Sequence, residues 1–243
     1  MLNGKRGFMF GDGKERVMDQ GNSNNVSWAV GGKDLLALAR KARNNEEYQR
    51  AADYYDDLLD KEPNNWEAAY YSMFCRLDYS NVRRQIDTAL TIDDTMAKVI
   101  ELLATANLIP QEKYYAVKNI SEEIRELATK LFDSFEVEKM DPNSFRRYKK
   151  LTLSWCKALF TIGYSVYDYF VDTDWKTANL STMCLEKCNE IANRLLEDTY
   201  SLPRLRYYSQ AKKALMPYIE DATETIQVFD QHYVAPKANF RFF

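Results

Sequence analysis

Residues 35–73 read LLALARKARNNEEYQRAADYYDDLLDKEPNNWEAAYYSM, and this stretch decides the fold. Apolar residues recur in it every three to four positions, first over 35–42 and again over 48–59, which is the period of amphipathic helices. A polar turn at 43–47 separates the two runs, and Pro63 ends the second before a third begins at Trp66. We therefore predict two antiparallel helices that approach closely through alanines, followed by the start of a third helix.

The order of these residues resembles one tetratricopeptide repeat plus the first helix of the next. The likeness is carried by Leu35, Leu38, Ala39, Ala51, Tyr55, Leu58 and the run from Pro63 to Tyr70. Ala42 and Arg76 stand where that family usually has a large aromatic residue, and Met73 stands where it has a small one. The resemblance implies a scaffold that binds a protein or a peptide. It also implies further helices stacked on the hairpin, because such repeats need neighbours to bury their faces.

The rest of the chain is predicted to be helical as well. Seven of the eight glycines lie in residues 1–32, so the body contains only Gly163. Stripes of apolar residues with helical spacing cover 82–103, 112–139, 144–170, 174–197 and 203–230. Asp93 and Asp94 interrupt the first stripe, which leaves either one kinked helix or two helices. The predicted fold class is all-α, with antiparallel helical hairpins stacked as a short right-handed solenoid or a bundle of tetratricopeptide-like type.

The same patterns divide the chain into four predicted parts. These are a flexible leader (1–32), tetratricopeptide-like hairpins (33–109), a bundle of long helices packed on them (110–231) and an aromatic C-terminal tail (232–243). The helix over 144–170 is apolar on two sides, which favours a central position, and Gly163 within it indicates a close helix crossing. We predict that Asp34 and Asp174 cap helices and that Pro217 kinks or splits the last one.

Composition argues against several classes of function. A net charge of −3 and a pI near 5.5 show no excess of Lys and Arg, so we expect no nucleic-acid partner. The most apolar segment, 151–171, is interrupted by Lys157 and Asp168, so we expect no membrane span. The four cysteines lie within apolar helical patterns, which is typical of reduced thiols in a cytoplasmic protein.

The sequence offers little that could catalyse a reaction. Its single histidine, His232, lies in the tail, away from any recognisable triad or zinc motif. Cys184 and Cys188 are four apart on a helix, but they could ligate a metal only with two further ligands, so we interpret them as part of a thiol-lined core. We expect no catalytic residue, no metal and no cofactor.

A concave binding surface follows from the tetratricopeptide resemblance. Its predicted lining is Leu36, Arg40, Arg43, Glu67, Tyr70, Tyr71 and Phe74. Arginine supplies forked donors for a carboxylate, and tyrosine and phenylalanine supply rigid contact area. The alternative is that these aromatics pack against residues 1–32 or the tail. Two functions remain open, namely a protein- or peptide-binding scaffold and a helical sensor or regulator that binds a peptide or a small molecule in its groove.

The C-terminal tail concentrates Tyr233, Phe240, Phe242 and Phe243 in a stretch without helical period. One interpretation is a frayed chain end. The other is a docking segment whose rings pack into an apolar groove of this protein or of a partner, including a second copy in a homo-oligomer.

Overall fold

The computed structural model describes residues 31–77, 81–200 and 204–237. In this part of the chain all regular structure is helical, with eight α-helices of nine or more residues and a short α7 of five residues. The helices are α1 (Gly32–Asn44), α2 (Tyr48–Lys61), α3 (Trp66–Phe74), α4 (Val82–Thr105), α5 (Pro110–Asp133), α6 (Pro142–Phe170), α7 (Trp175–Asn179), α8 (Ser181–Thr199) and α9 (Tyr208–Gln227). Two single 3₁₀ turns, η1 (Val137–Lys139) and η2 (Leu205–Tyr207), complete the set. The all-α prediction is confirmed.

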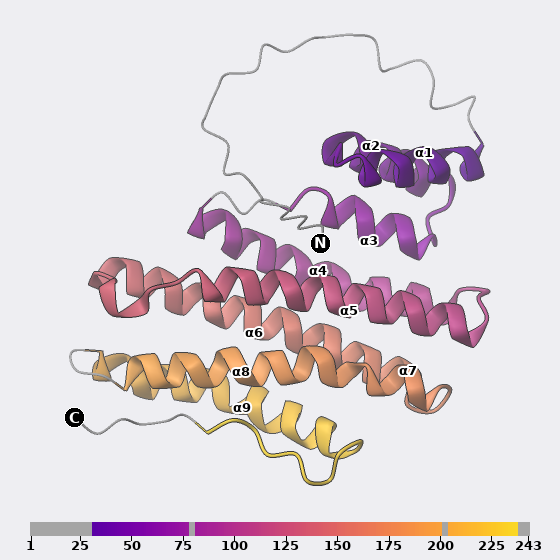
Figure 1. The fold of residues 1–243 in the computed structure, drawn as a ribbon. Helices are drawn as coiled ribbons and strands as arrows, with labels where there is room; N and C mark the ends of the chain where they lie inside the picture. The colour runs from indigo at the N-terminus through magenta and orange to yellow at the C-terminus, as the bar shows by residue number, and fades with distance from the viewer. Residues whose placement is uncertain (1–30, 78–80, 201–203, 238–243) are drawn as a thin grey trace, which may run out of the picture.

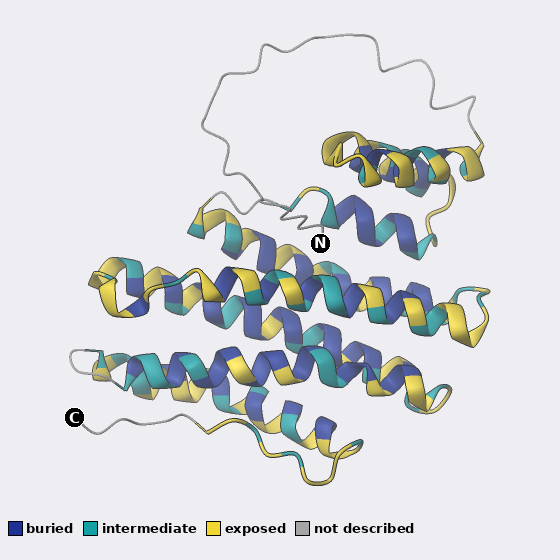
Figure 2. Cartoon of the chain, viewed as in Figure 1, coloured by how far each residue is buried: buried dark blue, intermediate teal, exposed yellow. Residues whose placement is uncertain are grey.

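The long helices are packed antiparallel, one after another, from α1 and α2 at one end of the array to α8 and α9 at the other (Figure 1). Helices α5 and α8 lie in one layer, and α4, α6 and α9 lie in a second layer behind it. Buried residues follow the inner faces of both layers (Figure 2). One continuous cluster of buried side chains runs from Leu35 in α1 to Ile219 in α9, so the predicted boundary at 109/110, in the α4–α5 connection, is crossed by a shared core.

Helix α6 is the centre of the array, as its two apolar faces predict. It packs along α4 on one side and along α8 on the other. Trp155, Leu159, Ile162 and Val166 are completely buried in it. A helix that is apolar on two sides needs two neighbours, and α4 and α8 supply them.

Gly163 marks the closest approach of α6 to α8. A Cβ built on it would lie 2.6 Å from Leu185 Cγ and 3.0 Å from the carbonyl oxygen of Ser181. The first distance is shorter than real carbon contacts and the second is tighter than most of them, so a side chain at this position would force Leu185 or the α8 backbone to shift. The predicted close crossing at this glycine is confirmed.

Helix α4 is one uninterrupted helix from Val82 to Thr105, and Asp93 explains the slip in its apolar pattern. Asp93 is buried, and its carboxylate accepts a hydrogen bond from Thr161 Oγ1 at 2.6 Å and pairs with Lys157 Nζ at 2.6 Å. Both partners belong to α6. A buried charge is tolerated when it is paired and hydrogen-bonded, so the acid that breaks the sequence pattern joins α4 to the central helix.

Several predicted helix ends differ from the structure. Helix α1 begins at Gly32, so Asp34 lies in its first turn and is not the cap. Its negative charge is stabilised there by the positive end of the helix dipole. Asp174 does cap a helix, accepting from the backbone nitrogens of Lys176 and Thr177, but the stretch 174–197 is split at Leu180 into α7 and α8. Helix α9 continues through Pro217 without being split.

The thiols are free, and three of the four are buried. Cys156 lies in α6, and Cys184 and Cys188 lie in α8. These three are buried, and Cys75 is half-buried directly after α3. The interpretation of 184 and 188 as core thiols agrees with this placement. Among the described residues, no helix has the length and apolar character needed to cross a membrane.

Replacing Gly163 with Ala tests the α6–α8 crossing. We expect the free energy of unfolding to fall by about 1–2 kcal/mol, because overpacking costs about 1–3 kcal/mol and the better helix propensity of alanine returns only part of that. Urea unfolding measures the change. The double variant with Leu185→Ala should lose less stability than the sum of the two single losses, because Leu185→Ala removes the atoms that the new Cβ would meet. Losses that simply add would contradict the close crossing.

Candidate functional site

The α1–α2 hairpin is held together by small residues that let its backbones approach closely. Ala39 of α1 and Ala51 and Ala52 of α2 are completely buried, and Tyr55 fills the space beside them. After α2 ends at Lys61, Asn65 caps α3 by accepting from the backbone nitrogen of Ala68 at 3.0 Å. Its cap positions Trp66 and Glu67, the first two residues of α3, beside α1.

A groove lies where α1 meets the start of α3 and the α4–α5 connection. We call it the α1–α3 groove, and its volume is about 680 Å³. It is lined by Leu36, Arg40, Glu62, Pro63, Asn64, Asn65, Trp66, Glu67, Ala106, Asn107 and Leu108. Leu36, Trp66 and Leu108 are half-buried and give it an apolar wall, and the exposed Asn64 and Asn107 stand on its rim.

A two-point ion pair between Arg40 and Glu67 spans the groove. Arg40 Nε donates to Glu67 Oε1 at 2.6 Å, and Nη2 donates to Oε2. The Glu67 side chain is nearly buried, with 10% of its surface exposed, whereas that of Arg40 is 53% exposed. The hydrogen bonds to Glu67 raise the pKa of the Arg40 guanidinium. Guanidinium has five N–H donors, so the two bonds to Glu67 do not use those of Nη1, and Arg40 is one of the residues that line the groove.

The seven predicted site residues fall into two groups. Leu36, Arg40 and Glu67 line the α1–α3 groove. Arg43, Tyr70, Tyr71 and Phe74 form a separate aromatic cluster: the Arg43 guanidinium lies 3.7 Å from the centre of the Tyr71 ring, and Phe74 stacks on Tyr70 with ring centres 5.3 Å apart. Tyr70 and Tyr71 are buried, so the rings of this cluster contribute packing between α1 and α3.

The aromatic cluster meets α5 through Glu123. Tyr70 Oη donates to Glu123 Oε2 at 2.9 Å, and Tyr71 Oη donates to Oε1 at 3.5 Å. Burial raises the pKa of the Glu123 carboxyl, although the hydrogen bond from Tyr70 and the nearby Arg43 act to lower it. The alternative that these rings pack against the leader concerns residues 1–30, which lie outside the described residues. The contacts that the structure does describe join α3 to α5.

Sequence reasoning missed part of this site. Trp66 was recognised only as the start of the third helix and as part of the run from Pro63 to Tyr70, and Asn107 and Leu108 were not singled out. Glu123 belonged to the polar face of a predicted amphipathic helix. No local signal could have found it, because its partners lie 52 and 53 residues earlier in the chain.

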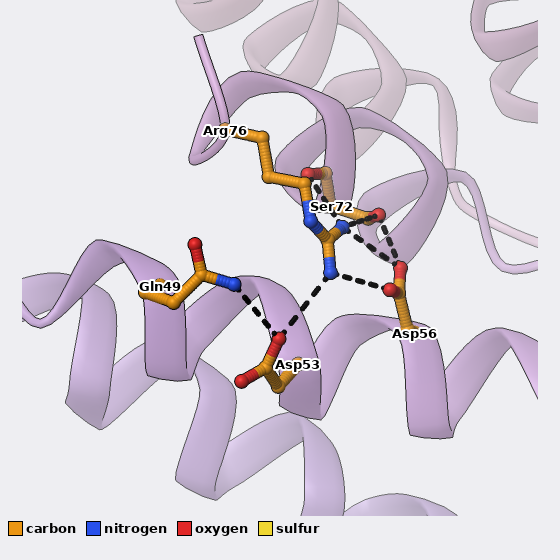
Figure 3. A network of polar contacts seen from close by, with 5 residues as sticks. All are labelled: Gln49, Asp53, Asp56, Ser72 and Arg76. Carbon is orange, nitrogen blue, oxygen red and sulfur yellow. Dashed lines mark hydrogen bonds and ion pairs between the residues drawn. The ribbon is translucent and has the colours of Figure 1, made fainter. Parts of the chain in front are cut away.

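A polar network joins α2 to the end of α3 on another side of the hairpin (Figure 3). Arg76 Nη2 pairs with Asp56 Oδ2 at 2.5 Å, and Asp56 Oδ1 accepts from Ser72 Oγ at 2.5 Å. Asp53 accepts from Gln49 at 3.1 Å and lies 3.4 Å from Arg76. Arg76 stands where tetratricopeptide repeats usually carry an aromatic, and here it ties the two helices together by charge instead of by ring packing.

The described residues hold no group of three or more His, Cys, Asp or Glu side chains that could bind a metal ion. No protein-family model matches the chain, and no curated protein or solved structure matches it either. The likeness of residues 35–73 to a tetratricopeptide repeat therefore stays a resemblance carried by the residues quoted for it.

Glu123→Gln tests the buried carboxylate through its pH dependence. A pKa raised in the folded state means that the folded protein binds this proton more tightly than the unfolded chain does, so ionisation of Glu123 lowers stability as pH rises through that pKa. Glutamine does not ionise and can still accept from Tyr70. We expect the stability of the variant minus that of the native chain, measured by urea unfolding, to increase from pH 4 to pH 7. A decrease over that range would show that the ionised carboxylate is net stabilised by its neighbours.

Proposed function

We propose that this protein is a non-enzymatic helical scaffold that binds a segment of a partner protein, or a peptide, in the α1–α3 groove. The observation that carries the proposal is the composition of the groove: three half-buried apolar side chains, a half-exposed guanidinium and two exposed asparagines, supplied by α1, α3 and the α2–α3 and α4–α5 connections. Preorganised elements lower the entropy cost of binding.

The order of the helices supports a tetratricopeptide-like arrangement. The consecutive pairs α1/α2, α3/α4 and α8/α9 each contain two neighbouring helices, as in a repeat of this type, whereas α6 packs on α4 and α8 instead of pairing with α5. In helical-repeat proteins this kind of stacking creates extended surfaces on which partners bind. The α1–α3 groove lies between the first two pairs, where such a surface would start.

The groove chemistry favours an extended peptide segment with a bulky apolar residue next to an acidic group. The apolar side chain would contact Leu36, Trp66 and Leu108, and a carboxylate would accept from Nη1 of Arg40. The amides of Asn64 and Asn107 can each donate to and accept from a peptide backbone. None of the lining residues is a serine, threonine, cysteine or histidine, so a nucleophile with an adjacent base is not present in the groove.

The alternative, a sensor that encloses a small molecule, requires a closed and mainly apolar pocket. The groove is open at its rim, where the exposed residues are Glu62, Pro63, Asn64 and Asn107. Its lining also includes the charged side chains of Arg40 and Glu67. These features favour a scaffold with an open groove.

A displayed library of random peptides, selected on the intact protein, tests the proposal. Enriched peptides are synthesised with a fluorescent label, and their Kd values are measured by anisotropy. We expect Leu36→Asp and Arg40→Ala each to weaken binding at least about tenfold, which corresponds to about 1.4 kcal/mol. Leu36 packs against the core, and Arg40→Ala leaves the nearly buried Glu67 carboxylate without its partner, so urea unfolding is measured for each variant and the Kd is compared only where the protein is folded.

Leu90→Asp is the matched control, because Leu90 is an exposed leucine of α4 that does not line the groove. It should leave the Kd unchanged. Peptides that bind equally well to all four proteins, or a selection that enriches no peptide, would refute the proposed groove.

A further inference from the structure

Helices α6 and α9 lie side by side in the second layer and run in the same direction (Figure 1). Contacts at their starts, middles and ends fix this arrangement: Lys149 with Gln210, Phe160 with Tyr218, and Tyr167 with Phe229. We call the exposed surface that the two helices share the α6–α9 face. On α6 it is a stripe of exposed side chains at helical spacing, namely Arg146, Lys150, Lys157, Tyr164 and Asp168. The rings of the predicted docking tail, Phe240, Phe242 and Phe243, lie outside the described residues.

Charge is separated along the α6–α9 face. At the starts of the two helices, residues 142–156 and 204–216 each contain four Lys or Arg and no acidic residue. Toward their ends, residues 158–175 contain three acids and residues 217–236 contain four, and neither range contains Lys or Arg. One end of the face is therefore basic and the other end is acidic.

These charges are available to a partner. In the part of the chain that the structure describes, the ion pairs involve other side chains, and within the α6 stripe only Lys157 is paired, with Asp93. At the basic end, the hydrogen bonds from Arg146 and Arg206 lower the pKa of the Tyr207 phenol. A phenol that ionises more readily marks a region of positive potential.

The middle of the α6–α9 face is aromatic. Tyr164 is 46% exposed and stacks on Phe160, with ring centres 5.6 Å apart. Phe160 in turn meets Tyr218 of α9, with ring centres 5.4 Å apart. Lys157 lies at the midpoint of the stripe, and its charge is already balanced. The face thus has an aromatic centre without net charge between two ends of opposite charge.

We propose that the α6–α9 face binds a second copy of this chain, with the helices of the two copies antiparallel and a two-fold axis beside Lys157. Positions equally distant from the axis then lie opposite each other. Arg146 of one copy faces Asp168 of the other, because each lies eleven positions from Lys157 in the sequence. Lys150 faces the exposed ring of Tyr164 in the same way, which is a favourable cation–π contact.

Helix α9 fits the same axis. Its contacts with α6 join residues that lie about 60 positions apart, so the axis that passes Lys157 crosses α9 beside Pro217. Lys213 and Asp221 are both exposed and each lies four positions from Pro217, so they also face each other between the two copies. Both helices therefore offer opposite charges to one arrangement, and the two-fold axis makes each pair occur twice.

The dimensions of the face suit a dimer. The stripe from Arg146 to Asp168 is about 33 Å long at about 1.5 Å per residue, and two adjacent helices are about 20 Å wide. The resulting area of about 650 Å² per copy is close to the about 800 Å² of a standard interface. Such a dimer leaves the α1–α3 groove open, because none of the residues that line the groove belongs to α6 or α9.

Two charge-reversed variants test this arrangement. The first carries Arg146→Glu and Lys213→Glu, and the second carries Asp168→Lys and Asp221→Lys. All four positions are exposed, and circular dichroism checks that each variant is folded. Sedimentation velocity over a concentration series measures the dimerisation Kd. We expect the native chain to dimerise and each variant alone to have a Kd at least about tenfold higher, because like charges then face each other.

Mixing the two variants in equal amounts tests the pairing itself. In the mixed dimer every reversed residue faces a residue of opposite charge, so we expect a Kd within about threefold of the native value. Lys33→Glu with Arg83→Glu, at two exposed bases of α1 and α4, is the control for the change in net charge and should dimerise like the native chain.

Three results would each overturn the proposal. They are a native chain that stays monomeric up to about 0.1 mM, a reversed variant that dimerises as tightly as the native chain, and a mixture that stays monomeric at that concentration.

Discussion

The structure depends on the packing of α6 between α4 and α8. On the α8 side the constraint is steric, since the two backbones approach so closely at Gly163 that even one methyl group would meet Leu185 and the Ser181 carbonyl. On the α4 side a buried acid, Asp93, is satisfied by Thr161 and Lys157 of α6. Protein interiors are close-packed, so a helix that is fixed on both sides also fixes the position of the helices that pack against it.

This central packing also positions the hairpin that carries the groove. Helix α3 packs on α4, and Tyr70 and Tyr71 reach Glu123 of α5, so the α1–α3 unit is joined to the rest of the array by apolar and polar contacts together. The network around Arg76 fixes the opposite side of the hairpin (Figure 3). A groove on such a unit presents its side chains in a set geometry, which is what a recognition surface requires.

The α1–α3 groove depends on three parts of the chain that the tertiary structure brings together. Leu36 and Arg40 belong to α1, Trp66 and Glu67 begin α3, and Leu108 follows α4. The ion pair between Arg40 and Glu67 fixes α1 against the start of α3 at this point.

The sequence by itself determined the helical class, the hairpin at 35–73, the central place of the 144–170 helix and the close crossing at Gly163, because each follows from local spacing and from the near absence of glycine. It also identified Leu36, Arg40 and Glu67, whose place on the helix faces is periodic. Only the tertiary structure decided that Tyr70 and Tyr71 turn inward to Glu123, that Asp93 is a buried link and not a break, and that Trp66, Asn107 and Leu108 complete the groove. These residues meet across tens of positions in the chain, and periodicity shows which face of a helix is apolar but not which neighbour covers it.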